Sequence, residues 1–440
     1  MSVVKTAAAV NGVEMNRLAP DDRAVHDWYR FILSYPPHLV REYLQRFQVD
    51  GSQCVLDPFC GTGTTLVECK KQGISSVGIE ANPMAHFACQ VKVDWTPEPT
   101  GLAEHAERIA EATLAELGAC GISDETLPLF RSAGTNGTGE LRQLPAETAQ
   151  LLLTNSISPL PLHKTLVLLE HMSRHQDARY TPHERLALAK ALVTSIGNLE
   201  FGPEVGVGPI KPDAAVVAPW LSALRAITAD LQACANGAAI PAVAYHADAR
   251  ALGEVLSPAS IDVVITSPPY PNEKDYTRTT RLESVLLGFV ADKAQLRHLK
   301  QGLIRSNTRG VYRNDDDDGW VVDHPEIQRI AAAIEARRIE LGKTSGFERM
   351  YARVTKLYFG GMVRHLADLR HILRPGARLA YVVGDQASYL RVMIRTGQIL
   401  ADLAASLGYE VVGIDLFRTR VATATREQLR EEVVVLKWPG

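Results

Sequence analysis

Two short segments of the sequence carry residues whose types and spacing could support chemistry. The first, at 57–65, reads DPFCGTGTT, and the second, at 266–270, reads TSPPY. Each follows a short apolar run that is typical of a buried strand. Ligands bind at the carboxyl ends of the strands in open α/β sheets. We therefore expect both segments to lie at one edge of a mostly parallel sheet.

The first segment predicts a glycine-rich turn between a strand and a helix. Gly61 and Gly63 would let the backbone approach a ligand closely, and the helix N-terminus after them favours a negative group. A dinucleotide fingerprint would need a glycine where this chain has Leu66, which disfavours nicotinamide and flavin cofactors. Glu80 ends the next strand, where a carboxylate can accept hydrogen bonds from both hydroxyls of a ribose. Asp248, after a later strand, could meet an adenine amino group; a purely structural turn is the alternative for the glycines alone.

The second segment predicts a rigid shelf of hydrogen-bond acceptors. Pro268 and Pro269 remove two backbone donors and stiffen the chain. Beside them stand the hydroxyl of Ser267 and the phenol ring of Tyr270. Such a shelf suits a planar substrate with an exocyclic amine, because the oxygens accept the amine hydrogens while the ring stacks on the base. A turn or polyproline segment is the alternative, but the apolar strand directly before the tetrad argues against it.

Together these residues resemble the amino-methyltransferase branch of the S-adenosylmethionine-dependent DNA methyltransferases. DPFCGTGTT is similar to the cofactor loop of that family, GIEANP to its acidic second-strand motif, and TSPPY to its catalytic tetrad. YPPHLVREYL is similar to its N-terminal cofactor motif, and NLEFGPEVGVGPIKPDA and SPPYPNEKDYTRTTRLESVLLGF resemble extended blocks of one bacterial subgroup. The resemblance covers about residues 26–95 and 240–440.

The resemblance implies S-adenosyl-L-methionine as the cofactor. The positions that match its cofactor-binding motifs are Tyr35, Pro36, Asp57, Pro58, Phe59, Gly61, Gly63, Thr64, Thr65, Glu80, Asn82 and Asp248.

The resemblance also implies the reaction, which is methyl transfer to the exocyclic N4 of a flipped cytosine in double-stranded DNA. The catalytic positions would be Ser267, Pro268, Pro269 and Tyr270. In that family SPPY is usual for cytosine-N4 enzymes, whereas adenine-N6 enzymes more often carry DPPY or NPPY. Three alternatives stay open: an adenine-N6 DNA methyltransferase, an RNA guanine-N2 methyltransferase, and a non-catalytic DNA-binding subunit with the same fold.

The hydrophobic pattern predicts an α/β fold. Seven apolar runs read as strands, with helices between most of them, at 55–59, 76–80, 242–246, 262–266, 378–383, 410–417 and 432–438. This pattern predicts a seven-stranded, doubly wound, mostly parallel sheet with helical insertions, which the resemblance identifies as class I methyltransferase-like. The last two runs are adjacent, so we expect one antiparallel edge.

The same pattern divides the chain into a catalytic domain and two insertions. We expect a mobile N-terminus at 1–25 and a methyltransferase domain made of 26–95, 240–299 and 347–440. A helical insertion at 96–239 is a candidate target-recognition region, and a second insertion at 300–346 is a candidate DNA-contacting loop and helix. The cofactor motif precedes the tetrad, the reverse of many cytosine-N4 enzymes, which leaves open which insertion reads DNA.

The net charge of −3 implies that a DNA contact would need a local basic face. The candidates are Lys274, Arg278 and Arg281 after the tetrad, and Arg305, Arg309 and Arg313 in the second insertion. The last three stand at four-residue spacing, although a solvated side chain is the alternative for each. The run Asp315–Asp318 lacks the spacing of a calcium loop, so we expect a solvated acidic loop and no metal.

Composition excludes several other classes of protein. The chain has 440 residues, of which 46% are hydrophobic, and no run approaches the ~18 apolar residues of a membrane span. The N-terminus lacks a signal-peptide core, and six cysteines without a CxxC pair suit free thiols in a reducing cytoplasm. We therefore expect a cytoplasmic protein that acts on double-stranded DNA, with a cognate restriction endonuclease as a candidate partner. The sequence defines neither the recognition site nor the oligomeric state.

Overall fold

The fold is seen in a computed structural model that describes residues 18–30, 34–124, 140–201, 205–272, 274–421 and 428–440. Most of the N-terminus expected to be mobile therefore lies outside the described residues. Its described end carries the 3₁₀ turn η2 (Pro20–Asp22), and Val25 is fully buried just before η3 (His26–Trp28). None of the helices described is long and apolar enough to cross a membrane.

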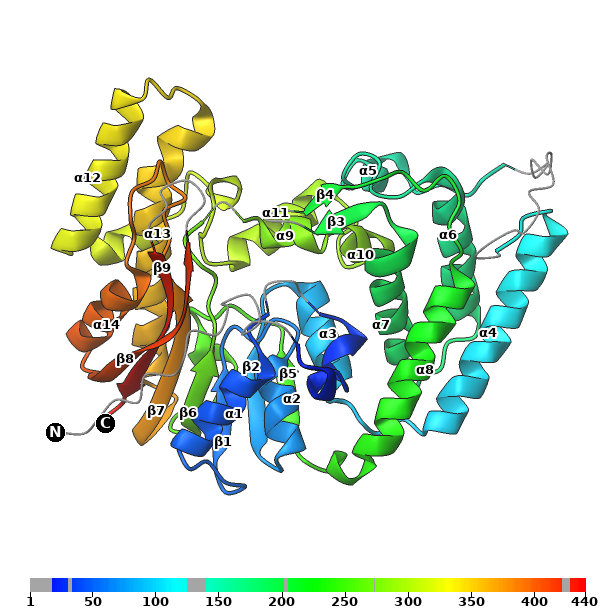
Figure 1. The fold of residues 1–440 in the computed structure, drawn as a ribbon, viewed down its shortest axis with the longest axis horizontal. Helices are drawn as coiled ribbons and strands as arrows, with labels where there is room; N and C mark the ends of the chain where they lie inside the picture. The colour runs from blue at the N-terminus through cyan, green and yellow to red at the C-terminus, as the bar shows by residue number, and fades with distance from the viewer. Residues whose placement is uncertain (1–17, 31–33, 125–139, 202–204, 273, 422–427) are drawn as a thin grey trace.

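A seven-stranded sheet forms the centre of the molecule, in the order β5-β2-β1-β6-β7-β9-β8 (Figure 1). Its strands are β1 (Cys54–Asp57), β2 (Ser75–Ile79), β5 (Ala242–Tyr245), β6 (Ile261–Thr266), β7 (Leu373–Gly384), β8 (Glu410–Val421) and β9 (Gln428–Lys437). All pairs are parallel except those that β9 makes with β7 and β8. This is the seven-stranded, mostly parallel sheet of the α/β fold expected from the sequence.

The prediction that the antiparallel strand lies at the edge of the sheet is wrong. The antiparallel strand β9 lies inside the sheet, and the edge strand β8 runs in the same direction as β7. The connection through α14 (Thr396–Ser406) carries the chain from β7 past one strand position before β8 begins. β9 then turns back from β8 and fills that position, so the two terminal strands pair as expected while their order is reversed.

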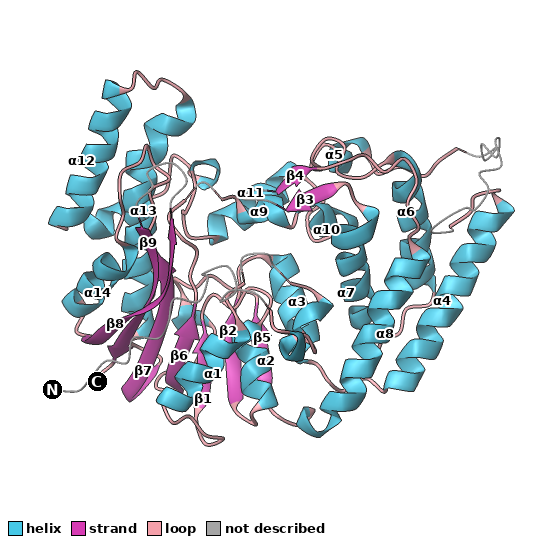
Figure 2. Cartoon of the chain, viewed as in Figure 1, coloured by secondary structure: helices cyan, strands magenta, loops and turns pink. Residues whose placement is uncertain are grey.

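Helices cover both faces of the sheet, as Figure 2 shows. Because both faces are buried, successive residues of β1 face opposite cores: Val55 packs with α1 (Pro37–Arg46), and Leu56 packs on the side of α13 (Gly346–Leu369) and α14. Helices α2 (Thr64–Lys71) and α3 (Pro83–Val93) follow β1 and β2. The doubly wound arrangement predicted from the sequence is therefore confirmed.

The first insertion is mostly helical, as predicted. Its helices are α4 (Pro99–Ala119), α5 (Ala146–Ala149), α6 (Pro159–Arg174), α7 (Thr181–Ala191) and α8 (Val217–Cys234), with η4 (Leu192–Ile196) and η5 (Ala235–Gly237). Its core residues Ile109, Leu188 and Trp220 belong to one cluster with Met84 of α3, so the insertion packs directly on a helix that covers the sheet. The insertion also contains a small antiparallel pair, β3 (Leu199–Phe201) with β4 (Val205–Val207).

The second insertion packs along α13. After η6 (Leu252–Glu254) and β6 come α9 (Tyr276–Thr279), α10 (Arg281–Leu286), α11 (Lys293–Gly302), η7 (Thr308–Gly310), η8 (Asp317–Val321) and α12 (Pro325–Glu340). Ile327, Ile330 and Ile334 of α12 share one buried cluster with Tyr358 of α13. The helix predicted after the aspartate run is therefore present, and it stands beside α13 at one end of the sheet (Figure 1).

Candidate active site

A cavity of about 540 Å³ lies at the carboxyl ends of the central strands. Gly61 and Glu80 line it from the turns after β1 and β2, and Asp248 lines it from the chain after β5. Ser267 and Tyr270 line it from the segment after β6. The glycine turn and the proline tetrad are therefore neighbours in one cavity, as the sequence predicted.

Strand pairing explains this proximity. β1 pairs directly with β6, with Val55 opposite Val263. At the ends of the two strands, the buried carboxylate of Asp57 accepts hydrogen bonds from the Thr65 hydroxyl (2.6 Å) and from the Thr266 hydroxyl (2.6 Å). It also accepts from the Tyr35 hydroxyl at 3.1 Å, while burial raises its pKa. Asp57 therefore joins three segments of the site from behind the cavity wall.

The turn after β1 depends on its glycines. Gly61 and Gly63 have φ values of +51° and +86°, in the left-handed region that favours glycine. A Cβ on Gly63 would lie 2.7 Å from the sulfur of Cys89, so a side chain there would overlap α3. Cys60 points inward, with its sulfur 3.8 Å from that of Cys89, which fits a packing role. The hydroxyl of Thr62, a residue of the cavity lining, is buried and has no hydrogen-bond partner among the described residues.

The carboxylate of Glu80 is held at the end of β2. It accepts hydrogen bonds from the backbone amides of Gly61 (2.9 Å) and Asn82 (2.7 Å). Burial raises the pKa of Glu80 to about 7. The Asn82 side chain caps α3 by accepting from the Met84 amide at 3.0 Å. Asn82 also lines the cavity, so its capping role orients the turn that carries Glu80.

The tetrad places a hydroxyl and a ring at the other end of the cavity. The Ser267 hydroxyl donates to the Val382 carbonyl at 3.2 Å, which leaves its oxygen able to accept from a ligand. The Tyr270 ring fits against Gly384, where a Cβ would lie 2.9 Å from the ring. Burial raises the pKa of Tyr270, so its phenol stays protonated. These groups can accept hydrogen bonds from an amine and stack on a planar base.

Most of the predicted site residues line this cavity. They are Tyr35, Pro36, Pro58, Phe59, Gly61, Thr64, Glu80, Asn82, Asp248, Ser267, Pro268, Pro269, Tyr270, Lys274 and Arg305. Asp57, Gly63 and Thr65, expected to bind the cofactor, do not belong to the cavity lining. Their hydrogen bonds and backbone geometry give them a positioning role instead.

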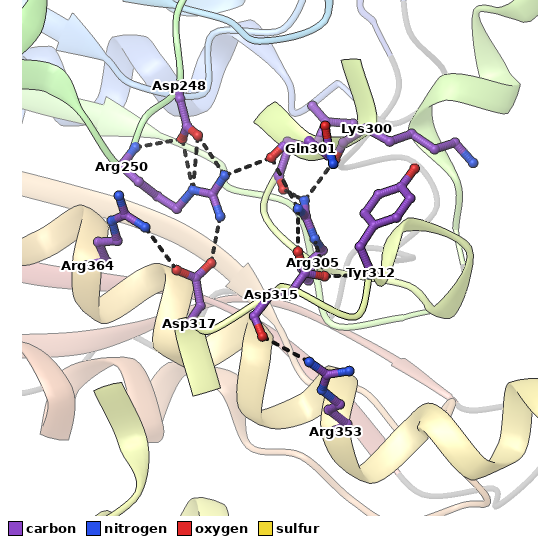
Figure 3. A network of polar contacts seen from close by, with 11 residues as sticks. Asp248, Arg250, Lys300, Gln301, Arg305, Tyr312, Asp315, Asp317, Arg353 and Arg364 are labelled. Atoms are coloured by element: carbon purple, nitrogen blue, oxygen red, sulfur yellow. Dashed lines mark hydrogen bonds and ion pairs between the residues drawn. The ribbon is translucent and has the colours of Figure 1, made fainter. Parts of the chain in front are cut away.

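The structure corrects the prediction that Arg305 belongs to a basic face that contacts DNA. This side chain is buried, and its guanidinium binds both carboxylate oxygens of Asp315, at 2.9 and 2.8 Å (Figure 3). It cannot also contact a DNA phosphate. Arg309 and Arg313 are exposed, but the only helical turn between 303 and 316 is η7, so the four-residue spacing does not place the three arginines on one face.

The basic residues after the tetrad differ among themselves. Arg281 donates to the Thr277 carbonyl at 3.1 Å and to the Leu151 carbonyl at 3.3 Å, so it links α10 to the first insertion. Arg278 is half-buried, and Lys274 lines the cavity. Of these three, Lys274 is the one that faces the site.

The acidic run is not the solvated loop expected from the sequence. Asp317 is buried and pairs with Arg250 at 2.6 Å, and Asp315 pairs with Arg305 at 2.8 Å. Both pairs are drawn in Figure 3. Asp315 and Asp317 turn their carboxylates inward. Buried arginines there compensate the two negative charges.

Sequence reasoning missed a large part of the cavity wall. The additional lining residues include Asn272, Asp275, Tyr276, Lys300, Ser306, Asn307, Gln386, Ser388, Phe417, Arg418, Arg420 and Glu431. Gln386 follows β7, so the rule that ligands lie at strand ends could have found it. Arg418 and Glu431 belong to β8 and β9, and their pairing at 2.6 Å is a contact between distant segments that no local signal reveals.

The chain is similar to known DNA methyltransferases. The N6/N4 methyltransferase family model, described as a DNA methylase, matches residues 21–88. The Type II methyltransferase M.BsoBI of Geobacillus stearothermophilus is 24% identical, over 99% of this chain and 88% of that protein. M.AvaI of Nostoc sp. is 23% identical, over 94% of this chain and 86% of that protein. Among solved structures, TrmN from Thermus thermophilus matches with a TM-score of 0.29 at 11% identity, over 94% of this chain and 52% of that chain.

Proposed function

We propose, from the premise that this chain belongs to the amino-DNA methyltransferase family, that it methylates the exocyclic N4 of a cytosine flipped out of double-stranded DNA. The methyl donor would be S-adenosyl-L-methionine. The observation that carries this proposal is the single cavity lined by both the glycine turn and the SPPY tetrad. We further propose that the protein acts in the cytoplasm and that a cognate restriction endonuclease accompanies it.

The cofactor end of the cavity suits an adenosine with a charged methionine. Glu80 offers a carboxylate for the ribose hydroxyls, and Asp248 offers one for the adenine amine. The unpartnered hydroxyl of Thr62 is a buried polar group that a ligand would satisfy. Pro36 and Phe59 supply apolar contacts at the same end. These residues fit S-adenosylmethionine, which supplies an electrophilic methyl group on its sulfonium when it is bound.

The tetrad end suits the target base. The Ser267 hydroxyl donates its hydrogen bond to the Val382 carbonyl, so its oxygen would accept one hydrogen of the cytosine amine. The Pro268 carbonyl would accept the other, and the two acceptors together would aim the nitrogen lone pair toward the cofactor end. Tyr270 would stack on the base. As the amine becomes positive, these acceptors stabilise the developing charge, and positioning supplies much of the remaining acceleration.

We propose that the target base lies in DNA, since the family model that matches residues 21–88 is described as a DNA methylase. A base inside a duplex cannot reach such a cavity, so the reaction would require base flipping. Lys274 lines the cavity, while Arg309 and Arg313 are exposed in the second insertion. We propose that these cations contact the backbone around the flipped nucleotide, with Arg278 as a further candidate.

Product analysis tests this function. The purified chain is incubated with S-adenosylmethionine and unmethylated phage DNA, and the digested nucleosides are separated by mass spectrometry. We expect N4-methylcytosine in the wild type and about 10–100-fold slower formation of it in a Ser267→Ala variant that still binds S-adenosylhomocysteine. N6-methyladenine as the product would replace the cytosine assignment. No binding of S-adenosylhomocysteine by the wild type would refute the enzyme and support a non-catalytic DNA-binding subunit.

A further inference from the structure

Arg250 connects the cavity to the acidic run of the second insertion. Its Nε and Nη2 donate to the carboxylate of Asp248 at 3.0 and 2.6 Å, and its Nη1 donates to Asp317 at 2.6 Å. Nη2 also donates to the Gln301 carbonyl at 3.0 Å. Only 9% of the Arg250 side chain and 4% of the Asp317 side chain are exposed. The guanidinium is therefore clamped between a carboxylate of the cavity wall and a buried one behind it.

Asp317 is fixed by close packing against α13. A Cβ on Gly360 would lie 1.7 Å from the Asp317 carbonyl oxygen, so the two backbones touch at this point. Gly361 lies beside the Asp317 side chain, since a Cβ on it would lie 3.3 Å from a carboxylate oxygen. Arg364 of α13 approaches the other carboxylate oxygen at 3.4 Å. Figure 3 shows the resulting chain of charges from α13 through Asp317 and Arg250 to Asp248.

We infer that Asp317 is a positioning residue for recognition of the cofactor's adenine, acting through Arg250 on Asp248. This inference rests on the proposed function and deepens it. The planar guanidinium presents its donors in a fixed fork, so the carboxylate that binds it bidentately takes its orientation from the arginine. Asp317 binds Nη1 on the opposite side of the guanidinium and so fixes the plane of that group. Asp248, whose side chain is 29% exposed, then presents its remaining acceptor capacity to the cavity in one direction.

The expected consequence is a specific loss of discrimination between purines. Adenine carries an amine that can donate to Asp248, whereas hypoxanthine carries a carbonyl at that position and a carboxylate repels it. A well-oriented Asp248 should favour S-adenosylhomocysteine over S-inosylhomocysteine at least tenfold, about the effect of one hydrogen bond to a charged group. A mobile Asp248 would accommodate both ligands more equally. General loosening of the fold would instead weaken both ligands by the same factor.

The experiment measures the dissociation constants of both ligands by calorimetry on the full chain. Asp317→Asn removes one charge of the clamp, and Arg250→Lys keeps the positive charge but lacks the fork. Asp316→Asn is the matched control, because Asp316 is exposed and makes no side-chain hydrogen bond as the N-cap of η8. Circular dichroism melting accompanies each variant, and Asp248→Ala, which removes both acceptor oxygens, gives the value for complete loss of recognition.

We expect a preference of at least tenfold for the adenine ligand in the wild type and Asp316→Asn, and about threefold or less in Asp317→Asn and Arg250→Lys. An unchanged preference in either clamp variant overturns the inference, as does an equal weakening of both ligands. If Asp317→Asn does not fold, Arg250→Lys decides alone. A wild type that binds neither ligand refutes the proposed function, and one that binds both equally refutes the role of Asp248; both results are distinct from failure of the clamp.

Discussion

Cofactor affinity should depend on pH through Glu80. Its carboxylate lies at the cavity wall, and its burial raises its pKa to about 7, with Asp57 as a further cause. The ionised form accepts from the amides of Gly61 and Asn82 and retains acceptor capacity for two ribose hydroxyls. A protonated Glu80 would lose part of that capacity. Because the raised pKa keeps Glu80 protonated below about pH 7, affinity should be present above that pH and fall as the pH drops through it.

The magnitude follows from this pKa. With a pKa of about 7, roughly a tenth of the free protein carries ionised Glu80 at pH 6 and roughly nine-tenths at pH 8. If ribose binding requires the ionised form, the dissociation constant should rise about tenfold from pH 8 to pH 6, which is about 1.4 kcal/mol. A Glu80→Gln variant accepts with one oxygen at every pH, so its affinity should be lower and nearly constant over this range.

Calorimetric titration with S-adenosylhomocysteine at pH 6, 7 and 8 checks this expectation without any need for DNA. Each variant is compared with the wild type in a buffer of constant ionic strength. An equal pH dependence in the wild type and in Glu80→Gln would assign the titration to another group and refute the reasoning. A flat wild-type profile would refute the raised pKa itself.

Three further expectations concern the tetrad, the glycine turn and the basic rim. Ser267→Ala should lower kcat by about 10–100-fold with little change in S-adenosylhomocysteine affinity, since it removes one acceptor from the amine; unchanged turnover in a radioactive methyl-transfer assay would contradict that role. Gly63→Ala should destabilise the fold by about 2–4 kcal/mol in urea unfolding, from its left-handed backbone and the overlap with Cys89, and a Cys89→Ala background should recover part of the loss. Arg309→Ala should reduce the salt dependence of DNA binding by about one phosphate contact, whereas Arg305→Ala should lower the melting temperature and leave that slope unchanged; a slope lowered by Arg305→Ala alone would contradict the burial of that side chain.

The strands and the centre of the site could be predicted because their signals are local. Runs such as DVVIT at Asp262–Thr266 are continuous and apolar, as expected for strands buried on both faces. Ligands bind at the carboxyl ends of the strands in such sheets, and this rule predicted that Gly61 and Ser267 lie close together although about 200 residues separate them.

The errors arose where distant segments meet. The position of β9 depends on how far the connection through α14 carries the chain, which no local pattern encodes. Arg305 and Asp315 looked like separate surface charges because their pairing requires a loop that reverses direction between them. The spacing of the arginines indicated a helical face only under the assumption of a helix, which the structure lacks over most of that segment.

The interior position of β9 makes the edge strand of the sheet depend on it. In the described sheet β8 pairs with β9 alone, and Arg418 of β8 binds Glu431 of β9. Deletion of residues 428–437 would therefore detach two strands from the sheet instead of one, together with the part of the cavity wall that Arg418 and Glu431 build.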